Sequence, residues 1–334
     1  MRAVVCRAFG GPDEARVESL PAPPMVAGGV RIAVHASAAS FASLLVMQGR
    51  HQNRAEPPFT PGTEIAGVVT GVGPGVDRFR PGDRVVAAVR SGGYADEAVA
   101  PQQTVFALPD AIGFATGACF PSIYGTVFAG LAWRARVRAD DTVLVHGAGG
   151  ASGLAAVGVA RAMGARVIAC AGGDDKLAAA REQGADALVD HRLDPVAGRV
   201  LALTGGRGVD VVVDPVGGDA FRASLGCLAP DGRLVSLGFA GGVIPTVPAN
   251  LLLVKNVTLI GLYWGHYLGW GRQGVDAATT ARVREAFAQL FAWTLAGRLR
   301  PRIDRTWPLE GFAEALARIA SREAVGRVVL LPRG

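Results

Sequence analysis

The chain has 334 residues, half of them hydrophobic, and a formal net charge of +6 at pH 7. This length predicts about two domains. The basic residues are scattered and form no tract, which argues against nucleic acid as a partner. No apolar run approaches the roughly 20 residues that span a bilayer, and the N-terminus lacks a signal-peptide core, so we expect a cytoplasmic protein that binds no membrane.

Residues 1–120 have the pattern of a compact, mostly antiparallel β domain. Short β-rich runs at 30–35, 65–70 and 84–89 are separated by Gly/Pro turns. After residue 297 a short strand, a helix and a terminal strand follow. We expect this tail, 298–334, to complete the N-terminal domain.

Residues 121–297 alternate between strand and helix patterns, and the clearest unit begins at Thr142. The apolar run Thr142–His146 leads directly into Gly147, Gly150 and Gly153, after which a helical pattern runs to Gly164 and a second strand follows. Such a turn lets the backbone approach a pyrophosphate at the positive end of a helix. The alternation predicts a doubly wound parallel sheet that binds a dinucleotide.

The end of the second strand indicates which dinucleotide. NAD enzymes hold the ribose 2′-hydroxyl with an Asp or Glu about 20 residues after the glycine motif. Here that position falls on 171–173, Ala-Gly-Gly, and Lys176 follows. The pattern favours NADPH. In the alternative interpretation Lys176 is a solvated charge and Asp174 or Asp175 caps the next helix, where it would also repel a phosphate.

Six landmarks in one order carry a family resemblance: 61–64 (PGTE), 67–86, the glycine turn, 210–218 (DVVVDPVGG), 232–238 (GRLVSLG), and 250–256 followed by Tyr-Trp-Gly. The chain resembles the zinc-independent quinone oxidoreductase (zeta-crystallin-like) branch of the medium-chain dehydrogenases/reductases. The resemblance implies a GroES-like substrate domain and a Rossmann domain, with NADPH meeting substrate in a cleft between them. Gly158 replaces a Gln commonly found in the branch.

The resemblance also implies where the cofactor binds. The glycine turn contributes Gly150, Ala151, Ser152 and Gly153. The surroundings of the 2′-phosphate are Lys176 with Gly172, His191 and Arg322. Residues at later strand ends are Gly238, Phe239 and Tyr263. Taken alone, His191 and Arg322 have the pattern of surface residues.

No metal site is predicted. Zinc-dependent relatives carry a Cys where this chain has Ser40 and a His where it has Thr63. A catalytic zinc needs three protein ligands, so we expect none here, and Glu64 has the pattern of a structural carboxylate. Without a Lewis acid, hydride addition to an electrophilic quinone or enone is easier than interconversion of an alcohol and a ketone.

The substrate-facing candidates come from the resemblance and are Ser40, His51 and Tyr124. Ser40 stands where the branch often has Asn, and His51 where it often has Tyr. Either could donate a hydrogen bond to the substrate oxygen on which charge develops. Two alternatives stay open: Ser40 and Ser43 cap a helix over 41–48, and Tyr124 is a packing residue.

The sequence thus predicts an NADPH-dependent, zinc-free reductase of quinones or α,β-unsaturated carbonyl compounds. Two other hypotheses stay open. One is an enoyl-thioester reductase, and the other is a non-catalytic NADPH-binding protein with a structural or sensing role. In the resembling family the strand before Tyr263 commonly pairs between subunits, so we expect a homodimer.

Overall fold

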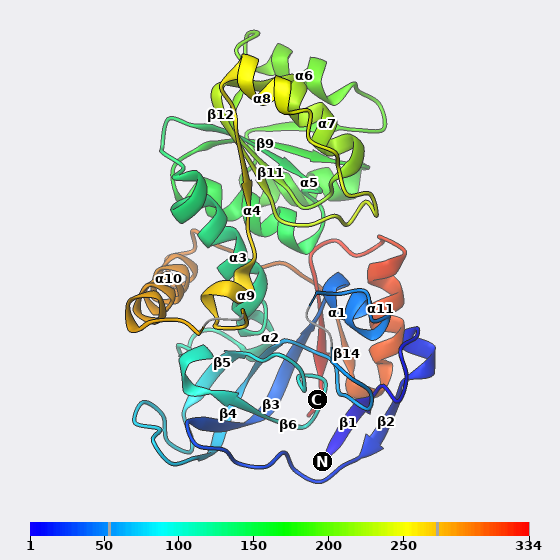
Figure 1. Cartoon of the computed structure of the whole chain (residues 1–334), viewed down its shortest axis with the longest axis vertical. Coiled ribbons are helices and arrows are strands. Elements are labelled where there is room, and N and C mark those ends of the chain that lie inside the picture. The colour runs from blue at the N-terminus through cyan, green and yellow to red at the C-terminus, as the bar shows by residue number, and fades with distance from the viewer. Residues whose placement is uncertain (53–54, 272–273, 334) are drawn as a thin grey trace. The chain divides into compact units, whose positions relative to one another are not determined.

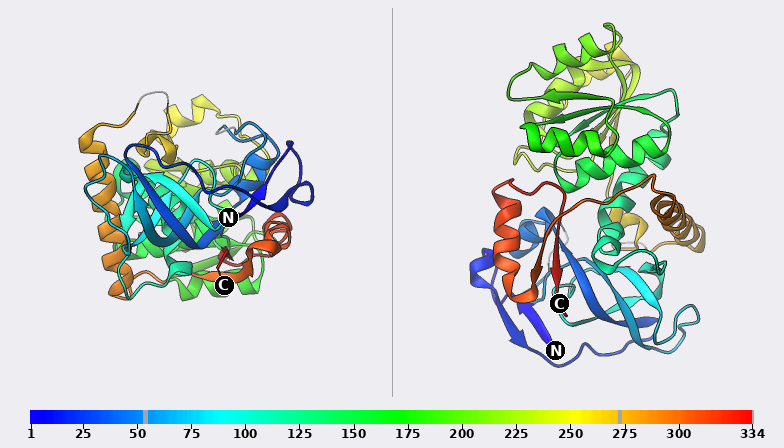
Figure 2. Two further views of the ribbon diagram at one scale, coloured as in Figure 1. Left: turned by 90° about the horizontal axis from the view of Figure 1, so that it is seen from below. Right: turned by 180° about the vertical axis from the view of Figure 1, so that it is seen from behind.

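A computed structural model describes residues 1–52, 55–271 and 274–333. The chain forms two compact units (Figure 1). The first unit comprises 1–122, 265–291 and 302–334, and the second comprises 123–264 and 292–301. Both termini belong to the first unit (Figure 2).

The first unit is built on a seven-stranded sheet in which only the β14–β15 pair is parallel. The strands, in spatial order, are β14 (Ile303–Pro308), β15 (Arg327–Leu331), β3 (Gly29–Ala39), β4 (Glu64–Val72), β5 (Arg84–Ala88) and β7 (Val105–Ala107), and β6 (Glu97–Pro101) also pairs with β3. A separate antiparallel pair consists of β1 (Arg2–Val5) and β2 (Arg16–Ser19). Because β15 pairs with β3, the C-terminal tail is part of this β-rich unit.

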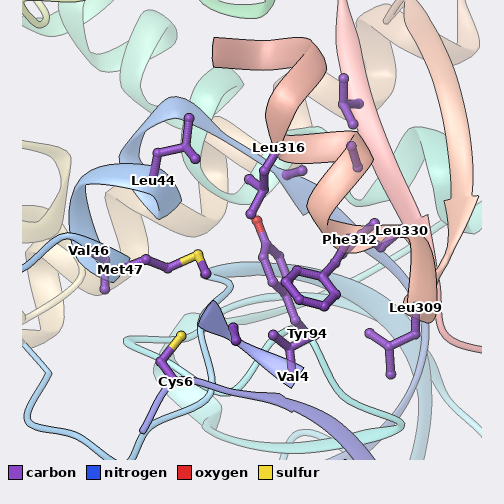
Figure 3. Close-up of a cluster of buried hydrophobic side chains, with 14 of the residues drawn as sticks. Val4, Cys6, Leu44, Val46, Met47, Tyr94, Leu309, Phe312, Leu316 and Leu330 are labelled. Atoms are coloured by element: carbon purple, nitrogen blue, oxygen red, sulfur yellow. The ribbon is translucent and has the colours of Figure 1, made fainter. Parts of the chain in front are cut away.

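A hydrophobic cluster forms beside this sheet (Figure 3). Helix α11 (Phe312–Ala320) contributes Phe312, Ala315 and Leu316, which lie on one face at helical spacing. Helix α1 (Phe41–Met47) contributes Leu44 and Met47. Tyr94 lies among them and is fully buried, so its hydroxyl must find its partner inside the protein.

Helix α10 (Ala277–Leu295) begins in the first unit. Phe287 on this helix stacks on Phe106 of β7, with ring centroids 3.7 Å apart, and Phe291 meets Phe120 edge-on. The domain boundary predicted at residue 297 would place residues 265–291 in the cofactor domain. The structure groups them with the β-rich unit instead. The short helix α9 (Trp264–Tyr267) begins at the boundary between the two units.

The second unit holds a six-stranded, entirely parallel sheet. Its spatial order is β10 (Ala187–Asp190), β9 (Arg166–Ala171), β8 (Thr142–His146), β11 (Val209–Asp214), β12 (Leu228–Ser236) and β13 (Thr258–Gly261). The helices of this unit are α4 (Ala151–Ala162), α5 (Asp174–Glu182), α6 (Val196–Leu203), α7 (Gly218–Cys227) and α8 (Ala249–Lys255). Helices lie on both faces of the sheet (Figure 2). The strand order is that of a dinucleotide-binding doubly wound sheet, as predicted.

One helical stretch is long and apolar enough to be compared with a membrane span. Residues 114–134 form a 21-residue helical stretch that by length and composition alone could cross a membrane, although 61% of its most apolar window is buried within the protein. It consists of α2 (Phe114–Gly117), the π-helical η3 (Phe120–Tyr124), α3 (Gly125–Phe128) and the π-helical η4 (Ala129–Ala135). The sequence expectation concerned uninterrupted apolar runs, and Thr, Ser, Pro, Tyr and Gly residues interrupt this one. Such burial is typical of a core helix.

Candidate active site

The glycine turn after β8 is shaped by close approach of the backbone. Gly147 has φ +58°, a left-handed conformation that favours glycine. A Cβ atom at Gly153 would lie 2.6 Å from the Cα atom of Ala148, so no larger residue fits without a backbone shift. Gly150 is the N-cap of α4 and supplies no side-chain cap. The helix start is therefore open to an anion, which the helix dipole would stabilise.

Lys176 lies beside this turn. A Cβ atom at Gly149 would overlap the Lys176 stem, including Cδ at 2.8 Å. Lys176 is in the first turn of α5, whose N-cap is Gly173 with φ +99°. The alternative in which an aspartate caps this helix is therefore wrong, because Asp174 and Asp175 are already helical. The Lys176 stem, up to Cδ, therefore lies against the glycine turn.

The end of β9 is occupied by side chains from the end of β10. His191 Nε2 would be 2.9 Å from a Cβ atom at Gly172. A carboxylate at this position, as NAD enzymes carry, would therefore have to displace the imidazole. Ala171, one residue earlier, is 2% exposed and faces the core. The predicted neighbours Gly172 and His191 are thus in contact.

Sequence reasoning missed two residues next to His191. Asp190 is in register with Ala171 of β9, and its carboxylate accepts hydrogen bonds from Arg192 Nη2 (2.8 Å) and from the Gly173 N–H (3.1 Å). The Arg192 hydrogen bonds hold the pKa of Asp190 far below its usual range. Residues 190–192 read Asp-His-Arg in the sequence, but periodicity does not reveal that strand register sets Asp190 beside Ala171.

The other cofactor candidates also follow strand ends. Gly238 and Phe239 come after β12, and Tyr263 comes after β13. Asp214, the last residue of β11, accepts hydrogen bonds from the Val216 and Gly217 N–H groups at 2.8 and 2.9 Å and orders the neighbouring loop. Phe239 and Tyr263 are partly exposed. The carboxyl ends of parallel strands lie along one edge of a sheet, where ligands of this architecture bind.

Ser40 lies in the first unit and has the capping role that the alternative predicted. It is the N-cap of α1, and its Oγ accepts a hydrogen bond from the Ser43 N–H at 3.1 Å. Tyr94 donates to Ser43 Oγ at 2.9 Å, and Ser43 Oγ is 3.0 Å from Ser40 Oγ. If each hydroxyl donates to the next, the Ser40 hydrogen is left for another acceptor. Burial raises the pKa of Tyr94 to about 12, so it stays a donor.

The remaining candidates are divided between the units. His51 is in the first unit and is partly exposed, and Arg322, in the same unit, has φ +62° after α11. Tyr124 is in the second unit and is 4% exposed. Their participation in a site stays a prediction.

Glu64 takes part in a buried ion pair. Its carboxylate contacts the Arg327 guanidinium, and its Oε1 accepts a hydrogen bond from the Ser122 N–H at 3.0 Å. Both side chains are at most 4% exposed, and burial lowers the pKa of Arg327 to about 9. These contacts fit a structural carboxylate. In the described ranges no three His, Cys, Asp or Glu side chains gather as metal ligands, and independence from metal stays a prediction.

Comparison with known proteins identifies the family. Residues 26–110 match the alcohol dehydrogenase GroES-like domain, and residues 151–279 match the zinc-binding dehydrogenase family. Quinone oxidoreductase-like protein 2 of Bos taurus is 37% identical over 98% of this chain and 92% of its own. The chain belongs to the zinc-independent quinone oxidoreductase family. Human quinone oxidoreductase is 31% identical over 99% of this chain and 98% of its own.

Solved members of this family have the same fold. Escherichia coli quinone oxidoreductase, complexed with NADPH, superimposes with a TM-score of 0.90 at 26% identity, covering 99% of this chain and all of that one. A mycobacterial protein complexed with NADPH gives 0.91 at 31% identity with the same coverage. The predicted family and the GroES-like plus Rossmann fold are confirmed.

Proposed function

We propose that this quinone oxidoreductase family member is an NADPH-dependent reductase of quinones or α,β-unsaturated carbonyl compounds. The observation that carries the proposal is the end of β9, where Lys176, His191 and Arg192 stand in place of the carboxylate of NAD enzymes. Two solved relatives that hold NADPH support this choice.

The residues present fit NADPH. The open start of α4, residues 150–153, would bind the pyrophosphate, and Gly172, Lys176 and His191 would surround the adenosine ribose phosphate. Gly238, Phe239 and Tyr263 follow strand ends on the same sheet edge. When bound, NADPH supplies the hydride, and the protein supplies orientation and electrostatic stabilisation.

The protein's chemical contribution would be a hydrogen bond to the substrate oxygen. Hydride addition to a quinone or to an enone β-carbon places negative charge on that oxygen, and a donor that binds this charge lowers the barrier. We assign this role to Ser40, whose own hydrogen is available if Tyr94 donates to Ser43 and Ser43 donates to Ser40. His51 is the second donor candidate. A soft electrophile needs no metal in such a step.

The experiment is an NADPH-oxidation screen with purified protein against an ortho-quinone, an alkenal, a cyclic enone and an enoyl thioester. Turnover of the quinone or the enones supports the proposal. Turnover of the thioester alone would assign the protein to enoyl-thioester reduction. NADPH binding without turnover of any substrate would favour a structural or sensing role.

We also propose a cytoplasmic homodimer formed through β13. This strand is the last in the parallel sheet, and an edge strand presents backbone groups that another chain can pair with. Leu253 and Val254 of the preceding helix α8 are 76% and 67% exposed. Light scattering should give twice the chain mass, and Val254→Asp should shift it toward the monomer. A monomeric parent protein would contradict this part.

A further inference from the structure

Besides Asp174 and Asp175 in the first turn of α5, a third carboxylate lies at the adenosine end of the proposed NADPH site. It does not come from the second strand, where NAD enzymes place it, but from Asp190 at the end of β10, in register with Ala171 at the end of β9. A carboxylate at this edge accepts ribose hydroxyls in NAD enzymes and repels a 2′-phosphate. A protein that prefers NADPH must therefore neutralise Asp190.

Arg192 neutralises it with a set of hydrogen bonds that uses both carboxylate oxygens. Oδ1 accepts from the Arg192 backbone N–H at 2.9 Å and from its Nε at 3.1 Å. Oδ2 accepts from Arg192 Nη2 at 2.8 Å and from the Gly173 N–H at 3.1 Å. The Asp190 side chain is 7% exposed, so protein groups and not water satisfy its carboxylate oxygens.

The same guanidinium is also available to a ligand. The Arg192 side chain is 55% exposed, and its Nη1 would be 3.2 Å from a Cβ atom at Gly173, so it lies over the start of α5. Nη1 has no hydrogen-bond partner within the part of the chain that the structure describes. A planar guanidinium with one edge on a carboxylate keeps its other edge for phosphate oxygens.

We propose that Arg192 determines cofactor choice by two linked effects. It binds the adenosine 2′-phosphate of NADPH with its outer edge, and it masks Asp190, which without it would accept the 2′-hydroxyl of NADH. The inference rests on the proposed NADPH function. A purely structural Arg192 would only fix the turn between β10 and α6.

The test measures dissociation constants of NADPH, NADH, 2′,5′-ADP and 5′-ADP by calorimetry, without turnover. Arg192→Ala should weaken NADPH and 2′,5′-ADP binding about 10- to 100-fold, the scale of a charge-assisted pair. NADH binding should stay equal or become tighter. Arg181→Ala, at the other end of α5, changes the net charge by the same amount. It should leave the dissociation constants of all four ligands within about twofold of the parent values.

A second variant isolates the masking effect. Asp190→Asn combined with Arg192→Ala removes both charges, so it should recover part of the NADPH affinity lost in Arg192→Ala and lose any NADH gain. If this double variant does not fold, the inference is tested by Arg192→Ala alone, through the ratio of its dissociation constants for 2′,5′-ADP and 5′-ADP. Equal weakening of both ligands with a lower melting temperature, or no change in their ratio, overturns the inference. A parent protein that binds neither cofactor instead overturns the proposed function.

Discussion

The stem of Lys176 lies so close to Gly149 that a methyl group at residue 149 would overlap it. Two segments 27 positions apart in the chain therefore touch at the point where β8 and α5 contribute to the proposed cofactor site. This contact places the Lys176 stem against the glycine turn.

Lys176→Ala should weaken NADPH binding by roughly 1–3 kcal/mol and leave NADH almost unchanged, because it removes one charge-assisted contact to the extra phosphate. Calorimetric titration with each cofactor checks this. Lys255→Ala, at the chain's only other lysine, is the matched control and should have no effect on either cofactor. Equal loss for both cofactors would make Lys176 a folding residue.

Ser40→Ala should lower kcat for quinone reduction about 100-fold, the usual cost of losing one oxyanion donor. Its cap on α1 is worth only about 1 kcal/mol, so the melting temperature should change little. His51→Phe tests the second donor in the same way. Ser321→Ala, which removes an exposed hydroxyl bonded to the Arg318 carbonyl, is the control. If both site variants react at the parent rate, neither residue is the donor.

Arg327→Met should destabilise the protein by about 3–5 kcal/mol, because it leaves the buried Glu64 carboxylate without its counter-charge. Adding Glu64→Gln should recover part of this loss, since the amide oxygen can still accept the hydrogen bond from Ser122. Urea unfolding of the two variants and the parent measures the free energies. A double variant less stable than Arg327→Met would show that the carboxylate has another buried partner.

Acid should destabilise the fold through His146. This buried side chain lies 2.9 Å from Ser224 Oγ, and since Ser224 donates to the Ala220 carbonyl, the imidazole Nε2 donates to Ser224. Burial lowers the pKa of His146 from 6.5 to about 4. Between these values the unfolded chain binds a proton that the folded chain does not, so stability falls as pH falls from about 6.5 to about 4.

His146→Gln should flatten this part of the pH profile, because glutamine does not titrate and its amide can still donate to Ser224. Melting temperatures from pH 7.5 to 4.5 check it, with His266→Gln at an exposed site as control. An unchanged slope in His146→Gln would assign the acid sensitivity to other groups.

Local patterns explain which parts the sequence predicted. The glycine turn, the parallel strands and the phosphate-side residues Gly172 and Lys176 are encoded by neighbours a few residues apart. Asp190 and Arg192 are only two positions apart, but the placement of Asp190 beside Ala171 depends on the register of β10 against β9, which periodicity does not reveal. The Tyr94–Ser43 hydrogen bond joins residues 51 positions apart, and the aromatic contact that groups α10 with the β-rich unit has an even longer separation. Such contacts depend on packing, so they required the structure.

Metal-free quinone reduction with NADPH is tested by the initial rate of NADPH oxidation by chelator-treated protein with an ortho-quinone as acceptor. We expect turnover that persists after chelation, with no stoichiometric zinc by elemental analysis and a higher kcat/KM for NADPH than for NADH. Oxidation that stops on chelation and returns with zinc, or a protein that uses only NADH, would contradict it.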